Sequence, residues 1–116
     1  MKILIVEDNQ PFREEMIRLI KKEEDEIYQC DDGIYVESLY EAIKPDVVLM
    51  DIKMKEMSGL EASKNLNEKH PEAKIIIVTN FNEEKIRQAA LQNGAKAFLP
   101  KENLTQLNQL LKDLEI

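Results

Sequence analysis

The sequence alternates short apolar runs with longer amphipathic segments, and it repeats this unit five times without a linker or a low-complexity tract. Most apolar runs are continuous and rich in β-branched residues, which predicts strands covered on both faces in a parallel sheet. We place these strands at residues 3–7, 27–30, 47–51, 75–79 and 97–100. The alternation predicts an α/β fold: an open, doubly wound sheet of five parallel strands in the flavodoxin-like order 2-1-3-4-5, with helices on both faces.

The spacing of apolar residues predicts a helix after each strand. Pro11 opens the first helix, a third begins near Gly59, and Asn82 caps a fourth that Gly94 ends. The first helix is expected to bury Phe12, Met16, Leu19 and Ile20. The last helix carries a leucine stripe, which indicates packing on the sheet rather than a coiled coil. This stripe is Leu104, Leu107, Leu110, Leu111 and Leu114.

The composition fits a single domain over residues 1–116. The hydrophobic content of 43% suffices for one core at this length. Cys30 is the only cysteine, so we expect a reducing compartment, the cytoplasm. The formal charge of −7 disfavours direct nucleic-acid binding, which depends on Lys and Arg contacts to phosphates. The apolar runs are far shorter than the roughly 20 residues of a membrane span, so no membrane contact is expected.

Polar residues stand at the ends of four predicted strands: Glu7 and Asp8, Asp51, Thr79, and Lys101. Because parallel strands end at the same edge of a sheet, we expect these side chains to meet there. Two carboxylates about 4 Å apart repel by about 4 kcal/mol at an effective dielectric constant near 20, so the cluster requires a compensating charge. Carboxylate oxygens completed by water are ligands that Mg²⁺ prefers.

The same edge carries a lysine and a hydroxyl, which a cation alone would not require but which an anion beside it would use. This combination indicates a phosphoryl group. Because Asp51 ends the central strand, between the acidic pair and Thr79, its carboxylate is best placed to attack phosphorus. The predicted chemistry is therefore phosphoryl transfer to a carboxylate.

Several motifs together resemble the receiver domains of two-component response regulators. The acidic pair lies in residues 5–9 (IVEDN), and the acceptor lies in residues 48–54 (VLMDIKM), followed by Gly59. Residues 77–79 (IVT) and 98–101 (FLPK) complete the pattern. Each motif is weak alone, but together they cover essentially the whole chain in the order and spacing of the family.

The resemblance implies a role for each residue of the acidic edge. Asp51 would accept a phosphoryl group from a histidine kinase, a histidine phosphotransfer protein or a small phosphodonor. Asp8, Asp51 and the main-chain carbonyl of Lys53 would hold Mg²⁺, with Glu7 acting through water. The domain would thereby catalyse its own phosphorylation and dephosphorylation, without turning over an external substrate.

The resemblance also implies a switch. Thr79 and Lys101 would bind the phosphoryl oxygens, and Phe98 would be the aromatic residue whose rotamer follows Thr79. The altered face would be the fourth helix, fifth strand and fifth helix, which would bind an output domain, a downstream protein or a second copy in a phosphorylation-dependent homodimer. Lys55 departs from the family pattern, which often has proline there, so the loop after the acceptor has a different course or freedom.

Other interpretations remain open at this point. The acids could be exposed loop residues, Lys101 a surface lysine, Thr79 a strand residue and Phe98 plain core. A small Mg²⁺-dependent phosphatase or nuclease could use the same acidic edge, although lysine at position 53 replaces the second acid of an Asp-x-Asp pair. An interaction module could also have this fold and switch without phosphate.

Overall fold

Parallel strands form the centre of the molecule in a computed structural model that describes residues 1–116. The strands pair in the order β2-β1-β3-β4-β5, which confirms the predicted flavodoxin-like sheet. They are β1 (Lys2–Val6), β2 (Glu26–Cys30), β3 (Val47–Met50), β4 (Ile75–Thr79) and β5 (Ala97–Pro100). The predicted strand ends are right to within one residue, and Glu7 and Asp51 lie directly after their strands rather than inside them.

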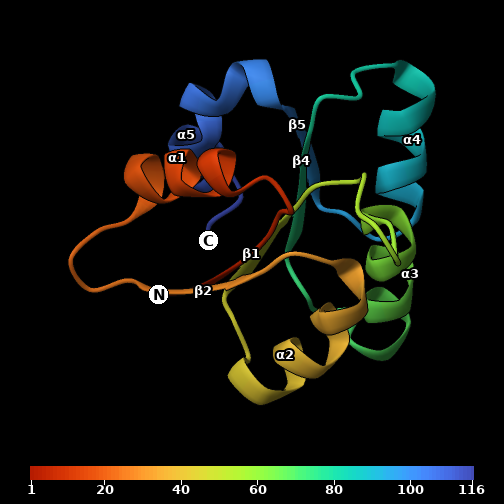
Figure 1. Cartoon of the computed structure of the whole chain (residues 1–116), viewed down its shortest axis with the longest axis horizontal. Helices are drawn as coiled ribbons and strands as arrows, with labels where there is room; N and C mark the ends of the chain where they lie inside the picture. Colours follow the sequence, from red (N-terminus) through yellow and green to blue (C-terminus); the bar gives the residue numbers. More distant parts are fainter.

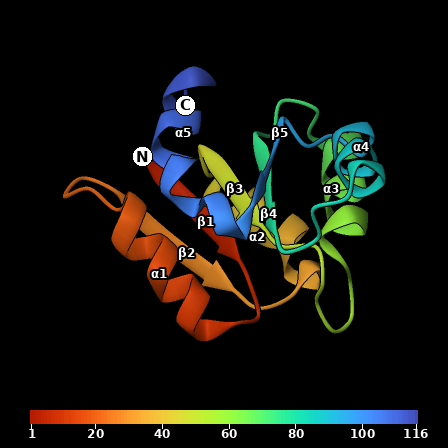
Figure 2. The ribbon, with the colours of Figure 1, turned by 90° about the horizontal axis from the view of Figure 1, so that it is seen from above.

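Helices cover both faces of the sheet (Figures 1 and 2). The α-helices are α1 (Gln10–Ile20), α2 (Val36–Ile43), α3 (Gly59–Lys69), α4 (Glu84–Gln92) and α5 (Leu107–Asp113). Short 3-10 helices precede two of them: η1 (Gly33–Tyr35) leads into α2, and η2 (Lys101–Gln106) leads into α5. None of these helices has the length and apolar character that a membrane span requires.

The sheet separates two apolar cores. Helices α1 and α5 lie on one face, and α2, α3 and α4 lie on the other (Figure 2). The first core contains Met16, Leu107 and Leu111 among buried strand residues, and the second contains Tyr40 and Leu66. Apolar side chains of β1, β3 and β4 alternate between these cores, which explains why residues 3–6, 47–50 and 75–78 are apolar at every position. The site thus stands on strands fixed from both sides.

Two helix ends differ from the sequence-based prediction. The cap prediction for Asn82 is wrong: α4 begins one residue later, with Glu83 at the capping position, and the Asn82 amide instead donates to Glu102 Oε1 at 3.2 Å. The predicted last helix is a 3-10 segment followed by α5, with a non-helical residue at Asn103 (φ −105°, ψ 25°). The leucine stripe still faces the sheet, because Leu104, Leu107 and Leu111 are buried.

Candidate functional site

The register of β1 and β3 places two acids side by side. Val6 pairs with Met50, so the next residues, Glu7 and Asp51, leave the sheet together. The main-chain N–H of Asp51 donates to the Val6 carbonyl at 3.0 Å, and the N–H of Glu7 donates to the Cys30 carbonyl at 3.0 Å. The backbone ladder therefore continues one step past the strands and fixes where both carboxylates emerge.

Asp8 completes a cluster with these acids. Glu7, Asp8 and Asp51 each offer a carboxylate oxygen, and these oxygens lie within 4.8 Å of one another. Glu7 and Asp51 are buried, at 0% and 6% exposure, whereas Asp8 is open to solvent. Hard oxygen donors with one open side are suited to a divalent cation that keeps part of its water shell, so the residues fit Mg²⁺.

Lys101 is the cation that the structure places at this cluster. Its Nζ lies 2.7 Å from Glu7 Oε1 and 3.1 Å from Asp51 Oδ2, and it sits 4.4 Å from the centroid of the Phe12 ring. Burial raises the pKa of Glu7 against the opposing effect of Lys101. Burial disfavours the charged form of Lys101, but its contacts with Glu7 and Asp51 outweigh that effect and raise its pKa.

Other hydrogen bonds orient the two buried carboxylates. Asn9 N–H donates to Glu7 Oε2 at 3.1 Å, and Ile52 N–H donates to Asp51 Oδ1 at 2.7 Å. Asp51 Oδ2 therefore remains as the oxygen that faces Lys101. The arrangement holds one carboxylate oxygen of Asp51 to the backbone and places the other beside the ammonium group of Lys101.

A cavity of about 450 Å³ opens over Asp51. Its lining combines the sequence-predicted residues with their neighbours: Asp8, Asn9, Asp51, Lys53, Met54, Lys55, Thr79, Asn80, Phe81 and Lys101. Thr79 is fully buried, and its Oγ1 accepts a hydrogen bond from Phe81 N–H at 3.4 Å. The structure thus brings Asp8, Asp51, Lys53, Thr79 and Lys101 to one opening, with Glu7 buried beneath Lys101.

Phe98 lies apart from this opening. It is half-buried in β5, packs against the core on the α2, α3 and α4 side, and lines a separate cavity of about 350 Å³ beside Gln106 and Leu110. Its neighbour along the sheet is Ile77, two residues before Thr79. Phe98 is therefore not paired with Thr79 in the sheet, and the expected coupling between their side chains stays a prediction.

Three residues near the site were not predicted from the sequence. Phe12 was expected only as core, but its ring lies under Lys101. Arg13 donates to the Glu7 carbonyl at 2.6 Å, and Asp32 accepts hydrogen bonds from the loop after β3. The only sequence signal was weak: each is a polar or aromatic residue shortly after a predicted strand.

Comparison with known proteins identifies relatives along nearly the whole chain. Residues 3–115 match the family model described as the response regulator receiver domain. The chemotaxis protein CheY of Listeria monocytogenes is 35% identical over 117 residues, which cover 99% of this chain and 96% of that protein. The transcriptional regulatory protein YdfI of Bacillus subtilis is 37% identical over 107 residues, or 90% of this chain and 50% of YdfI. This chain therefore spans about half the length of YdfI.

Solved structures agree with this family assignment. A DNA-binding response regulator of the LuxR family from Staphylococcus aureus has a TM-score of 0.88 and 32% identity, over 99% of this chain and 98% of that one. A complex of CheX and CheY with BeF3 and Mg²⁺ from Borrelia burgdorferi has a TM-score of 0.92 and 23% identity, over 100% of this chain and 90% of that chain. The second likeness concerns the fold alone.

Proposed function

The chain belongs to the response regulator receiver domains, and from this premise we propose that residues 1–116 form one receiver domain with Asp51 as its phosphoacceptor. The position of Asp51 Oδ2 carries the proposal. This oxygen lies 3.1 Å from Lys101 Nζ, at the base of an open cavity that Asp8 and Thr79 also line. A carboxylate in that place can reach an incoming phosphorus atom from the open side.

Mg²⁺ is the proposed metal. Asp8, Asp51 and the main-chain carbonyl of Lys53 would hold it, with Glu7 acting through water. Three carboxylates face one ammonium group in the cluster, which leaves an excess of negative charge for a divalent cation to offset. When bound, Mg²⁺ neutralises charge on the phosphoryl oxygens. The Borrelia burgdorferi complex, a protein of the same fold, contains BeF3 and Mg²⁺.

The transfer itself needs few groups from the protein. An Asp51 oxygen forms a bond to phosphorus while the bond from phosphorus to the donor breaks, and the donor leaves with that electron pair. Lys101 Nζ and the Thr79 hydroxyl then donate hydrogen bonds to oxygens of the new acyl phosphate. In the reverse step, water attacks the phosphorus, the bond between phosphorus and the Asp51 oxygen breaks, and inorganic phosphate leaves while Asp51 returns to its carboxylate form.

The proposed phosphodonor is a histidine kinase or a histidine phosphotransfer protein, and small phosphodonors such as acetyl phosphate would serve in vitro. Contacts that Thr79 and Lys101 make only with the phosphorylated form shift the balance between two conformations. We expect that shift to alter α4, β5 and α5, including Phe98, and to change the binding of an output partner or of a second copy. The cytoplasm stays the predicted location.

Labelling with acetyl phosphate and Mg²⁺ tests the acceptor. Intact-mass measurement should show the gain of one phosphoryl group in the wild type, and none after Asp51→Asn or in the presence of a chelator. Asp46→Asn is the matched control, because Asp46 precedes β3 at the other end of the same strand. It should label as the wild type does. Labelling that survives Asp51→Asn, or an unmodified wild type, would refute the proposal.

Amide spectra with beryllofluoride test the output face. We expect shifts around Phe98 and along α4 and α5 in the wild type, and none in Asp51→Asn. Spectra that change only next to the cavity would contradict a switch through this face.

A further inference from the structure

We propose that Asp32 is a positioning residue for the candidate site: its carboxylate fixes residues 51–58, the segment between β3 and α3, and thereby sets the main chain of Lys53 beside Asp51. The inference rests on the proposed function, since it concerns the site that would hold Mg²⁺ and the phosphoryl group. Asp32 itself lies after β2, outside that site.

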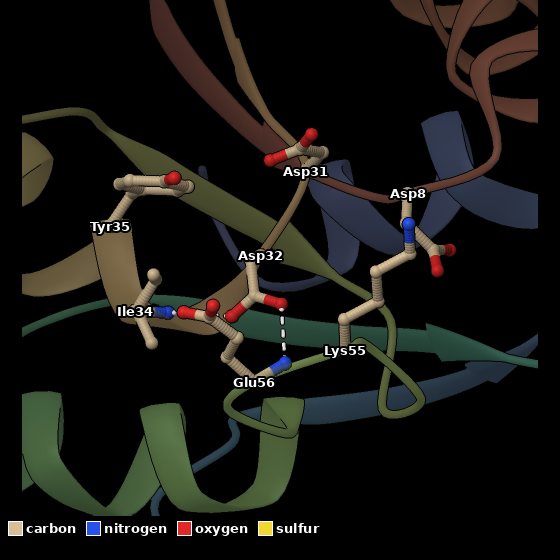
Figure 3. Close-up of a pocket in the computed structure, with 7 residues that line it drawn as sticks. All are labelled: Asp8, Asp31, Asp32, Ile34, Tyr35, Lys55 and Glu56. Carbon is tan, nitrogen blue, oxygen red and sulfur yellow. Dashed lines mark hydrogen bonds between the residues drawn. The ribbon is translucent and has the colours of Figure 1, made fainter.

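The carboxylate of Asp32 accepts hydrogen bonds from two separate segments. Oδ1 accepts from Met57 N–H at 3.0 Å and from Ile34 N–H at 3.1 Å. Oδ2 accepts from Glu56 N–H at 2.8 Å. Asp32 is only 5% exposed, and Figure 3 shows its bond from the Glu56 N–H. One side chain thus connects the start of η1 to the loop that follows the acceptor strand.

Close backbone contact reinforces this connection. Gly33 N–H donates to the Met57 carbonyl at 3.3 Å, and a Cβ at Gly33 would lie 2.6 Å from that oxygen. At the far side of the loop, Gly59 N–H donates to the Ile52 carbonyl at 2.8 Å. The loop is therefore tied to the start of η1 at Glu56 and Met57 and closed between Ile52 and Gly59, with Lys53 inside the closed stretch.

The loop held in this way forms a wall of the candidate site. Asp8 and Lys55 line the cavity over Asp51. Together with Asp32, they also line a neighbouring cavity of about 230 Å³ (Figure 3). Lys55 extends from the held loop toward Asp8 in that view. A displacement of residues 55–57 would therefore reshape both cavities and carry Lys53 with it.

A carboxylate suits this role better than an amide does. The two oxygens accept three N–H groups, whereas asparagine would turn an NH₂ donor toward at least one of them. Burial opposes the charged form of Asp32, but the bonds from Glu56, Ile34 and Met57 together lower its pKa. Asp32→Asn thus keeps the size of the side chain and removes an acceptor from at least one of these three N–H groups.

Asp25→Asn is the matched control. Asp25 is also buried, at 8% exposure, and also accepts from the backbone, with Lys22 N–H at 2.9 Å from Oδ2. It precedes β2, at the opposite end of the strand from Asp32, and its Oδ1 pairs with the terminal ammonium group at 3.0 Å. Both variants lose a buried acceptor, but only Asp32→Asn releases the loop beside Asp51.

The experiment measures Mg²⁺ affinity by calorimetry for the wild type and both variants, along with hydrogen exchange at the amides of Glu56 and Met57 in metal-free protein. We expect Asp32→Asn to weaken Mg²⁺ binding about tenfold, as loss of a group that orients a ligand does. Exchange at Glu56 and Met57 should accelerate in that variant alone. Asp25→Asn should bind Mg²⁺ as the wild type does, even where its melting temperature falls equally.

Equal Mg²⁺ affinity in Asp32→Asn and the wild type, or an equal loss in both variants, would overturn the role of Asp32. If Asp32→Asn does not fold, hydrogen exchange in the metal-free wild type decides. Unprotected amides at Glu56 and Met57 would overturn the role of Asp32, and slow exchange at both amides would support that role. A wild type that neither binds Mg²⁺ nor accepts a phosphoryl group would refute the proposed function instead.

Discussion

One main-chain oxygen explains why glycine stands at position 59. A Cβ there would lie 1.9 Å from the Asp51 carbonyl oxygen and 3.1 Å from the Ile52 Cα, so the first residue of α3 meets the backbone directly after the acceptor strand. The sequence could place Gly59 at the start of a helix, since the apolar spacing begins there. It could not reveal the contact, because only the folded loop brings position 59 back against Asp51.

Gly59→Ala should therefore destabilise the protein, although alanine is the better helix former. We expect the free energy of unfolding to fall by about 1–3 kcal/mol, the usual cost of forcing an extra carbon into a packed contact. Urea denaturation measures this change. Lys64→Ala, at an exposed position of α3, should stay within about 0.5 kcal/mol of the wild type. An unchanged free energy of unfolding in Gly59→Ala would show that the loop after β3 can move aside for the added carbon without cost.

At the scale of elements, the sequence predicted the strands well because most contain a continuous apolar run, which is buried on both faces of the sheet in β1, β3 and β4. Helix ends were harder. Asn82 had the right side chain for a cap, but its amide donates to Glu102, a partner that lies 20 residues away. Asp32 was missed for the same reason, since its partners Glu56 and Met57 become neighbours only when β2 and β3 flank β1.

The link between α2 and the end of α3 predicts a pH dependence. His70, which caps α3, lies 3.0 Å from Glu41 Oε2 on α2 and 3.5 Å from Glu72 Oε1. The hydrogen bond with Glu41 is the main cause that raises the pKa of His70. The stabilisation that charged His70 contributes is then fully present below the ordinary histidine pKa of about 6.5. It is lost as pH rises through the higher pKa of His70 in the folded state.

We expect the unfolding free energy, measured from pH 5.5 to pH 8, to fall more in the wild type than in Glu41→Gln, which removes the charge that His70 faces. Identical pH profiles for the two proteins would contradict the link. The comparison cancels other groups that titrate in this range, including the terminal ammonium group, whose pKa Asp25 raises.

At the scale of the whole molecule, the sheet order explains why distant residues meet. Parallel strands all end at one edge, so a polar residue after each of β1, β3 and β5 reaches the same place, and this much followed from the alternation of strands and helices. The ion pairs of Lys101 and the ring of Phe12 did not follow from it. Those contacts depend on where η2 and α1 lie against the sheet, which sequence spacing does not encode.

The acidic cluster should cost the metal-free protein stability. Asp8→Asn removes one of three neighbouring negative charges, and we expect the unfolding free energy without Mg²⁺ to rise by about 1 kcal/mol, the repulsion of charges about 4 Å apart in a water-like dielectric. The same variant should gain less thermal stability from added Mg²⁺ than the wild type gains. Thermal denaturation with and without Mg²⁺ measures both effects.

Glu68→Gln removes an exposed negative charge from α3, away from the cluster, and controls for the net charge of −7. Its effects on the unfolding free energy without Mg²⁺ and on the stability gained from Mg²⁺ should both be smaller than those of Asp8→Asn. An Asp8→Asn variant that is less stable than the wild type without Mg²⁺ would show that the cluster is not under electrostatic strain.

Lys101 lies between Glu7 and Asp51, so the acidic cluster has a counter-ion that is part of the same polypeptide chain. Unlike a free cation, this counter-ion does not dissociate on dilution, so the negative charge of the cluster stays partly neutralised. Under the proposed function, a divalent cation bound to the acids would offset the negative charge that Lys101 now balances, and Lys101 Nζ would then be available to donate to a phosphoryl oxygen. After loss of the phosphoryl group, we expect Nζ to return to Glu7 and Asp51, so that the side chain of the protein itself restores the unphosphorylated site.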